Sequence, residues 1–292
     1  MSAPAEAPPS SGRTPPLDEP PKELLFRRRI RPLAAARELW QARSLIRALA
    51  ERELRSRYKQ TIIGVGWAVI TPVTFMVVFT VFFQRVAKVD TQGAPYPVFS
   101  YVGLLPWTFF SSSVSRGGLS LVANLSLLNK VYCPREVFPI GSVIVAAIDT
   151  ATALIGLVLL FAITQYAPRP ESIYLPLMVY VVAAFTLGVT LIVSVLTVYF
   201  RDLRQAIPII LPLGLFATPV AFSITAIPSW ARPLYAVFNP LAPAIDGLRR
   251  TVLFGMPPAW NLLGLGAISA TVVLIVGFLV FKRMEAGVAD VA

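Results

Sequence analysis

Residues 139–164 read PIGSVIVAAIDTATALIGLVLLFAIT, an almost continuous apolar run in which Asp149 is the only charged side chain. A helix of this length can cross a hydrocarbon core of about 30 Å. Five further runs of similar character occur along the chain, at 62–83, about 98–121, 174–200, 207–224 and 261–281. The sequence therefore predicts an all-α integral membrane protein with six transmembrane helices.

The composition supports this class and excludes several others. Of the 292 residues, 56% are hydrophobic and 14% are charged, whereas soluble domains average about 45–50% apolar and about 25% charged residues. The chain has no histidine and a single cysteine, which excludes histidine-dependent catalysis, histidine-ligated metals and an intramolecular disulfide. We expect no catalytic, cofactor-binding or metal site in this chain.

The distribution of cations predicts the orientation in the membrane. Lys and Arg outnumber Asp and Glu by 26 to 15. With the N-terminus inside, 19 of these cations lie on the inner side, six on the outer side, and Arg116 lies within a span. Because inner loops are enriched in Lys and Arg, we expect both termini in the cytoplasm and the chain in the cytoplasmic (inner) membrane. Basic flanks beside spans explain the charge better than nucleic-acid binding, so we expect no nucleic-acid partner.

The residues before the first span divide into two regions. Residues 1–30 are rich in Pro, Ala and Ser, and such a segment cannot bury a core, so we predict a disordered cytoplasmic tail. Residues 31–60 place apolar side chains at helical spacing among many arginines, which is typical of an amphipathic helix in the membrane interface. A solvated surface helix is the alternative. Residues 61–292 then form the six-span domain.

The connection before the last span predicts an unusual element. Residues 225–260 are rather apolar and are interrupted by six prolines. Such segments are too short and broken to span a bilayer, yet too apolar to remain in water. We predict two short helices that re-enter the outer half of the bilayer and pack against protein.

Two charged side chains are predicted to meet inside the membrane. Arg116 and Asp149 are the only ionisable residues well inside the predicted spans, and they are equidistant in sequence from the turn at residues 132–133. An unpaired charge at this depth costs roughly 2.5–3.5 kcal/mol even on lenient scales. We therefore predict an Arg116–Asp149 ion pair, within one subunit or across a dimer. The alternative is an Asp149 solvated separately in a wet cavity.

The second predicted span differs from the others. Serines, glycines and an arginine occupy residues 111–118, a composition that favours packing against protein or lining a polar path over facing lipid. Aromatic residues gather toward the outer end of this span, where their faces can stack on sugar rings. The alternative is the aromatic belt of a membrane interface. The channel-lining candidates are Tyr101, Trp107, Phe109 and Phe110.

Two features of the sequence concern the energy source: the turn between the second and third spans, and the residues that precede each lysine. Residues 129–139 mix charged, aromatic and proline side chains, which suits a cytoplasmic docking element, although an ordinary capped turn has the same composition. A phosphate-binding loop needs a lysine directly after glycine, and none of the five lysines has this context. ATP-driven work would therefore require a partner subunit that binds ATP and Mg.

Several motifs in a fixed order resemble the membrane subunits of bacterial ABC exporters for polysaccharides, of the O-antigen and teichoic acid type. They are ELRSRYKQTIIGVGW at 53–67, GLLPWTFF at 103–110, NKVYCPRE at 129–136, YFRDL at 199–203, NPL at 239–241 and IDGLR at 245–249. The resemblance extends from about residue 35 to the C-terminus. One departure is Cys133, because the family usually has an aromatic residue at that position.

The resemblance implies a homodimer of six-span permease subunits in contact with membrane lipid. This dimer would dock two cytoplasmic nucleotide-binding ATPase subunits and export a polyprenyl-diphosphate-linked polysaccharide, such as an O-antigen, a galactan or a teichoic-acid-like glycan. The implied interface helix contains Trp40, Arg47, Arg55, Arg57 and Tyr58. The implied ATPase coupling turn contains Asn129, Lys130, Tyr132, Cys133, Pro134, Arg135 and Glu136. The implied outer gate contains Trp230, Tyr235, Phe238, Asn239 and Pro240.

Two other functions fit parts of the pattern. Type 2 ABC exporters of lipids or drugs share the architecture. A membrane enzyme acting on polyprenyl-linked substrates would need clustered carboxylates, whereas Asp149, Asp202 and Asp246 lie far apart in the sequence. The permease hypothesis therefore requires no covalent chemistry from this chain.

Overall fold

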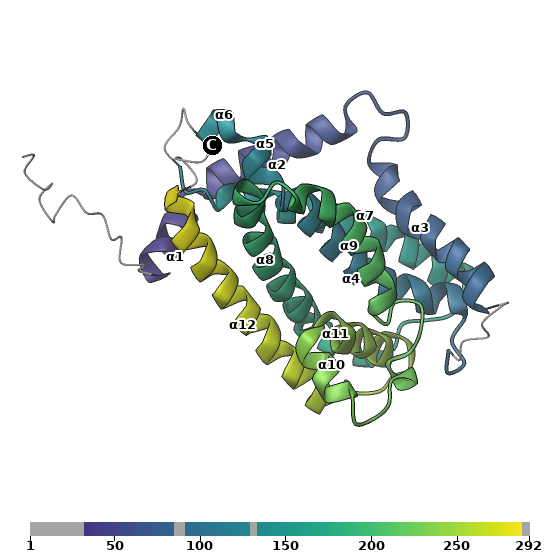
Figure 1. Ribbon diagram of the computed structural model, residues 1–292. Coiled ribbons are helices and arrows are strands. Elements are labelled where there is room, and N and C mark those ends of the chain that lie inside the picture. The colour runs from purple at the N-terminus through teal and green to yellow at the C-terminus, as the bar shows by residue number, and fades with distance from the viewer. Residues whose placement is uncertain (1–31, 85–90, 129–132, 288–292) are drawn as a thin grey trace, which may run out of the picture.

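The structure, a computed structural model, describes residues 32–84, 91–128 and 133–287, and every regular element in these ranges is helical (Figure 1). The predicted tail at residues 1–30 lies outside them. The α-helices are α1 Pro32–Gln41, α2 Arg43–Tyr58, α3 Trp67–Phe79, α4 Tyr96–Gly117, α5 Ser120–Ala123, α6 Leu125–Leu128, α7 Val137–Thr164, α8 Leu175–Tyr199, α9 Leu203–Ala217, α10 Arg232–Phe238, α11 Leu241–Leu248 and α12 Trp260–Met284. Single 3-10 turns lie at Gly64–Gly66, Pro170–Tyr174, Ile224–Ala226 and Glu285–Gly287, and π-helical turns at Thr80–Gln84 and Arg249–Leu253.

Four of the described helical stretches are long and apolar enough to cross a membrane. They are Gly64–Phe83, Val137–Thr164, Pro170–Tyr199 and Trp260–Met284, and they coincide with the first, third, fourth and sixth predicted spans. The chain is thus a multi-pass membrane protein. α4 and α9 occupy the places of the second and fifth predicted spans, but α4 is more polar and α9 has only 15 residues. The count of six spans therefore stays a prediction.

The fifth predicted span, 207–224, is wrong at both ends. α9 begins at Leu203 and ends at Ala217, and Thr218 after it has an extended backbone. Thr218 precedes Pro219, and the ring of a proline disfavours helical geometry in the residue before it. The chain then runs irregularly to the 3-10 turn Ile224–Ala226. Hydropathy alone did not register this break, because the residues after it are also apolar.

The short helices divide between the two ends of the bundle. In Figure 1, α2, α5 and α6 lie at one end, together with the C-terminal end of α12, whereas α10 and α11 lie at the other end. The long helices run between these ends, with α8 packed along α12 and α4 along α7. The predicted short helices before the last span thus exist as α10 and α11. Their depth in a bilayer stays a prediction.

α4 forms the centre of the bundle. It contacts α3, α7, α8, α9 and α11, and most of its side chains are buried, Val98, Tyr101 and Leu104 completely. The prediction that this helix packs against protein is confirmed. A helix whose neighbours are protein on nearly every side can carry serines and an arginine that lipid would not tolerate.

Glycines set the close approach of α8 and α12. A Cβ atom placed on Gly188 would lie 2.6 Å from the carbonyl oxygen of Val273, and a Cβ on Gly277 would collide with the backbone of Gly188. No larger side chain fits between these two backbones. Small residues serve this purpose in membrane helices, where close packing supplies much of the association energy.

The N-terminal helical segment is interrupted at Ala42, so the predicted single helix at 31–60 is two helices. α2 packs against α7 and buries Ile46, Leu49 and Ala50, whereas Trp40 of α1 is 71% exposed. Ile46 and Leu49 belong to a second hydrophobic cluster at this end of the bundle, which we call the inner core. Its other buried members are Leu121, Val137, Phe138, Leu191, Val195, Val198 and Phe281.

Candidate functional site

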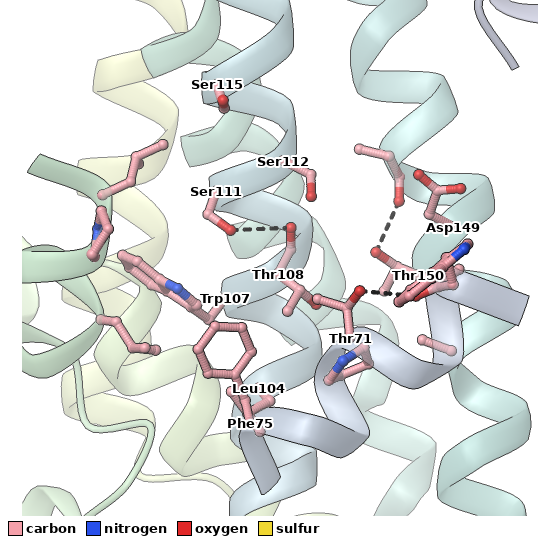
Figure 2. A pocket seen from close by; sticks show the side chains of 18 of the residues that line it. Thr71, Phe75, Leu104, Trp107, Thr108, Ser111, Ser112, Ser115, Asp149 and Thr150 are labelled. Carbon is pink, nitrogen blue, oxygen red and sulfur yellow. Dashed lines mark hydrogen bonds between the residues drawn. The ribbon is translucent and has the colours of Figure 1, made fainter. Parts of the chain in front are cut away.

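A groove of about 550 Å³ lies between α3, α4, α7 and α9. Figure 2 shows side chains from three of these helices converging on it. Its wall includes Thr71, Phe75 and Phe79 of α3, Leu104, Trp107, Thr108, Ser111, Ser112, Ser115 and Arg116 of α4, Asp149, Thr150 and Ala153 of α7, and Pro212, Leu215 and Phe216 of α9. Arg57 of α2 also contributes.

Hydroxyl groups form a stripe along one wall of the groove. Thr108, Ser111, Ser112 and Ser115 follow the helical spacing of i, i+3, i+4 and i+7, so they share one face of α4. Thr108 donates to the carbonyl oxygen of Leu105 at 3.0 Å, as Ser111 does to that of Thr108 at 3.4 Å. Their oxygen lone pairs therefore remain free to accept hydrogen bonds from an occupant. The opposite wall is largely apolar and aromatic.

Asp149 at the edge of this groove is paired with the end of α2, not with Arg116. Arg57 donates to one carboxylate oxygen of Asp149, and the Tyr58 hydroxyl donates to the other at 2.6 Å. Burial and this hydrogen bond raise the pKa of Tyr58 to about 12, so it stays a donor at physiological pH. The predicted Arg116–Asp149 pair within one subunit is therefore wrong. Because α2 packs directly on α7, Arg57 and Tyr58 occupy the carboxylate of Asp149 instead.

Asp149→Asn is expected to destabilise the protein, because it leaves the guanidinium of Arg57 without its counter-ion. Removing one partner of a buried pair costs about 3–5 kcal/mol, and we expect the lower end since Arg57 keeps 25% side-chain exposure. A double-mutant cycle on the melting temperature of the detergent-purified protein, with Arg57→Gln, should give a coupling of about 1–3 kcal/mol. The exposed Asp202→Asn is the control. A larger coupling of Asp149 to Arg116 would contradict the observed pairing.

The four channel-lining candidates separate in the structure. Trp107 lines the groove, whereas Tyr101 is fully buried and donates from its hydroxyl to the carbonyl oxygen of Ala153 at 2.9 Å. Phe109 is 9% exposed and belongs to the bundle core. Phe110 stacks on Phe185 with ring centroids 5.5 Å apart. Within one chain, therefore, the groove receives only Trp107 of these four, because successive aromatics on α4 point to different sides of a central helix.

The predicted coupling turn is partly described. Asn129, Lys130 and Tyr132 lie outside the described residues, and Cys133 packs partly buried against the inner core. Pro134 and Arg135 lead into Glu136, which precedes α7 and is fully buried. The ammonium group of Lys282 near the end of α12 forms an ion pair with Glu136 and lies 3.2 Å from Glu285. The sequence analysis did not link Glu136 with Lys282, because 146 positions separate them in the chain.

The predicted interface helix contributes exposed charges and one contact to the groove. Arg47 pairs with Glu51 at 3.0 Å and Arg55 with the same carboxylate at 3.8 Å, both arginines being exposed. Arg57 and Tyr58 face inward toward Asp149. Only the last turn of α2 therefore reaches the groove.

The predicted outer-gate residues do not form one cluster. Trp230 and Phe238 are 80% and 76% exposed, whereas Pro240 is buried at the start of α11. The Tyr235 hydroxyl donates to the carbonyl oxygen of Ala217, and Asn239 donates to the Thr218 hydroxyl at 3.0 Å. These two bonds join α10 to the end of α9.

Arg249, the last residue of the IDGLR motif at 245–249, holds several main-chain carbonyl oxygens, a role that the motif alone did not predict. It is 2% exposed, and its guanidinium donates to the carbonyl oxygens of Phe99 at 3.1 Å, Pro219 at 2.7 Å, Phe222 at 2.9 Å and Val220. It also lies 3.6 Å from the centroid of the Phe99 ring. Besides the motif, the signal in the sequence was a cation within an apolar segment interrupted by prolines, where unsatisfied carbonyls are expected.

The fold and groove together define a class of protein. Within the described residues, no group of three His, Cys, Asp or Glu side chains is placed to hold a metal ion. The class is that of helical multi-pass membrane proteins, here with a groove lined by hydroxyls and rings between the helices. Residues 44–253 match the model of the ABC-2 type transporter family, and the chain belongs to that family.

Named relatives cover most of the chain. The O-antigen export system permease protein RfbA of Myxococcus xanthus is 32% identical over 253 residues, which are 85% of this chain and 96% of that protein. An RfbA protein of Klebsiella pneumoniae is 27% identical over 254 residues, 85% of this chain and 94% of the relative. The polysialic acid transport protein KpsM of Escherichia coli is 25% identical over 247 residues, 82% and 93% of the two chains.

Proposed function

We propose that this chain is the membrane-spanning permease subunit of an ATP-driven ABC exporter that carries a polyprenyl-diphosphate-linked polysaccharide across the cytoplasmic membrane. The observation that carries the proposal is the groove, in which a hydroxyl stripe on α4 faces rings on α3 and α9. Sugars present hydroxyls at their edges and apolar faces to aromatic rings, so such a groove suits a glycan. The names of the relatives, for O-antigen and polysialic acid export, support the same substrate class.

A homodimer with six spans per subunit and cytoplasmic termini completes the proposal. Apolar side chains beside the groove are exposed, among them Val78 of α3 at 55% and Leu213 and Phe216 of α9 at 65% and 60%. A second copy placed across the groove would cover such a surface and enclose the path. Closed twofold symmetry is the commonest arrangement of homo-oligomers. Lipid would cover the remaining apolar surface.

Two cytoplasmic ATPase subunits, which bind ATP and Mg, supply the energy in this proposal. The turn ending at Glu136 would seat in the ATPase as the coupling element. Val137 and Phe138 after the turn share the inner core with Ile46 and Leu49 of α2 and Phe281 of α12. A movement of the docked turn on ATP binding would therefore move the interface helix and the last span with it, and so change the width of the central path.

Co-purification with an ATPase tests the proposal first. The chain, isolated from native membranes in mild detergent, is expected to carry an ATPase subunit near one-to-one. The double substitution of Arg135 and Glu136 with alanine should lower the ATPase activity of the eluate severalfold, whereas exposed Arg201→Ala should leave it unchanged. Absence of any ATPase under these conditions would contradict the proposal.

Depletion of the chain identifies the cargo. Polyprenyl-linked glycan is expected to accumulate on the inner face of the membrane when the chain is depleted, with loss of the surface polysaccharide. Accumulation of a phospholipid or a drug instead would assign the chain to the lipid or drug exporters of the same architecture. Turnover of a polyprenyl-linked substrate by the purified chain alone would indicate a membrane enzyme.

A further inference from the structure

A second cavity adjoins the groove at its inner end, and Arg116 lines both. The second cavity has a volume of about 390 Å³ and lies between α2, α4, α5 and α7. Its wall includes Arg52, Glu53, Ser115, Arg116, Ser120, Asn124 and Ser142. Ser115 and Arg116 also line the groove, so they stand at the junction of the two spaces.

The other charged groups at this junction already have partners. Asp149 accepts hydrogen bonds from Arg57 and Tyr58, and Glu53 accepts one from the Ser142 hydroxyl at 2.9 Å. Arg52 donates to the side-chain oxygen of Asn124 at 2.6 Å. Each of these groups is therefore directed toward a neighbour within the chain.

Arg116 differs from them. In the part of the chain that the structure describes, its guanidinium makes no salt bridge and donates no hydrogen bond, although Asp149 and Glu53 lie within electrostatic range. It is half-buried, and its nitrogen atoms are not sealed off from the cavities. A guanidinium presents five donors in a planar fork that matches phosphate oxygens, and leaving these donors unused inside a membrane protein is costly.

We propose that Arg116 binds the phosphoryl group of a polyprenyl-linked substrate at the junction of the two cavities. The inference rests on the proposed function and adds the position at which the charge of the substrate is held. The hydroxyls and rings of the groove suit sugars but carry no charge, so Arg116 supplies the attraction that they lack. Ser115, beside it on α4 and lining both cavities, is placed to donate a further hydrogen bond.

The test measures lipid binding to the complex of this chain with its ATPase, in nanodiscs of phosphatidylcholine. The probes are undecaprenyl diphosphate, neutral undecaprenol, phosphatidylglycerol and inorganic diphosphate. Arg116→Gln is expected to weaken the binding of undecaprenyl diphosphate roughly tenfold, since a charge-assisted hydrogen bond is lost. The same substitution should leave the binding of undecaprenol unchanged. Arg116→Lys keeps the positive charge and should recover part of the affinity for undecaprenyl diphosphate. Such a recovery would show that the loss in Arg116→Gln does not come from misfolding. Arg201→Gln on the exposed α8–α9 connection is the matched control.

Each other outcome overturns the inference. Equal binding of undecaprenyl diphosphate to wild type and Arg116→Gln would exclude a phosphoryl contact, as would a parallel loss of undecaprenol binding. Equal competition by phosphatidylglycerol would assign the site to bulk anionic lipid, and equal affinity for inorganic diphosphate would assign it to a free anion. Failure of the proposed function is distinguishable, because glycan accumulation on depletion does not depend on Arg116.

Discussion

Arg249→Met is expected to lower the melting temperature of the detergent-purified protein by much more than the same substitution at the neighbouring, half-buried Arg250. Its guanidinium donates to four main-chain carbonyl oxygens, three of them in the irregular segment Pro219–Phe222. A buried acceptor left unsatisfied costs about 1–3 kcal/mol, so the loss should reach several kcal/mol even if some carbonyls find water. Substrate export should fall with stability.

The neighbouring residue provides the control. Arg250 is only half-buried and donates to a single carbonyl oxygen, that of Pro257 at 3.0 Å, so Arg250→Met should shift the melting temperature far less. Similar shifts for both substitutions would contradict the view that Arg249 organises the end of α9, α11 and the start of α4. The melting temperature of Arg249→Lys should lie between those of Arg249→Met and Arg250→Met, because an ammonium group cannot reach all four acceptors that the planar guanidinium reaches.

Lys282→Met is expected to destabilise the end of the bundle that contains α2 and the C-terminal end of α12 by about 3–5 kcal/mol, the cost of removing one partner from a buried ion pair. Glu136 is fully buried and would lose the ammonium group that pairs with it. Glu285 shares the same lysine at 3.2 Å, and burial together with the nearby Glu136 raises the pKa of Glu285 above its usual range. Because Glu136 leads out of the proposed coupling turn, the ATPase should co-purify less well. Thermal unfolding and the ATPase-to-permease ratio measure the two effects.

A second substitution separates loss of the charge pair from loss of packing. Glu136→Gln in the Lys282→Met background removes the unpaired carboxylate and should restore much of the stability, as the coupling of contacting residues predicts. The adjacent and exposed Arg283→Met is the control and should behave as wild type. If the double variant were no more stable than Lys282→Met alone, the ion pair would not be the source of the effect.

Parts of the fold follow from composition because they depend on solvent preference alone. The runs around Asp149 and along residues 261–281 had to be membrane helices, since nothing else buries that many apolar side chains while satisfying the backbone. The polar face of α4 likewise indicated a helix surrounded by protein, and its burial confirms this. The span predicted at 207–224 ran through Pro219, although the steric effect of this proline on Thr218 is local and marks the end of α9.

The contacts of individual charged and aromatic side chains did not follow from the composition of the sequence. Depth in the membrane suggested Arg116 for Asp149, yet the contact of α2 with α7 gives Asp149 to Arg57 and Tyr58. Likewise, Trp107 and Tyr101 are equally aromatic, but one lines the groove and the other donates into the core.

The sequence by itself therefore determined that this chain is a helical membrane protein, which residues enter its long helices, and to which family its motifs belong. Only the tertiary structure decided which side chains share the groove, which carboxylate pairs with which cation, and that Lys282 meets Glu136. The physical reason is that hydropathy and helix periodicity are local properties of the chain, whereas an ion pair or a groove depends on the rotation and the neighbours of each helix. Those are set by packing among segments that lie far apart in the sequence.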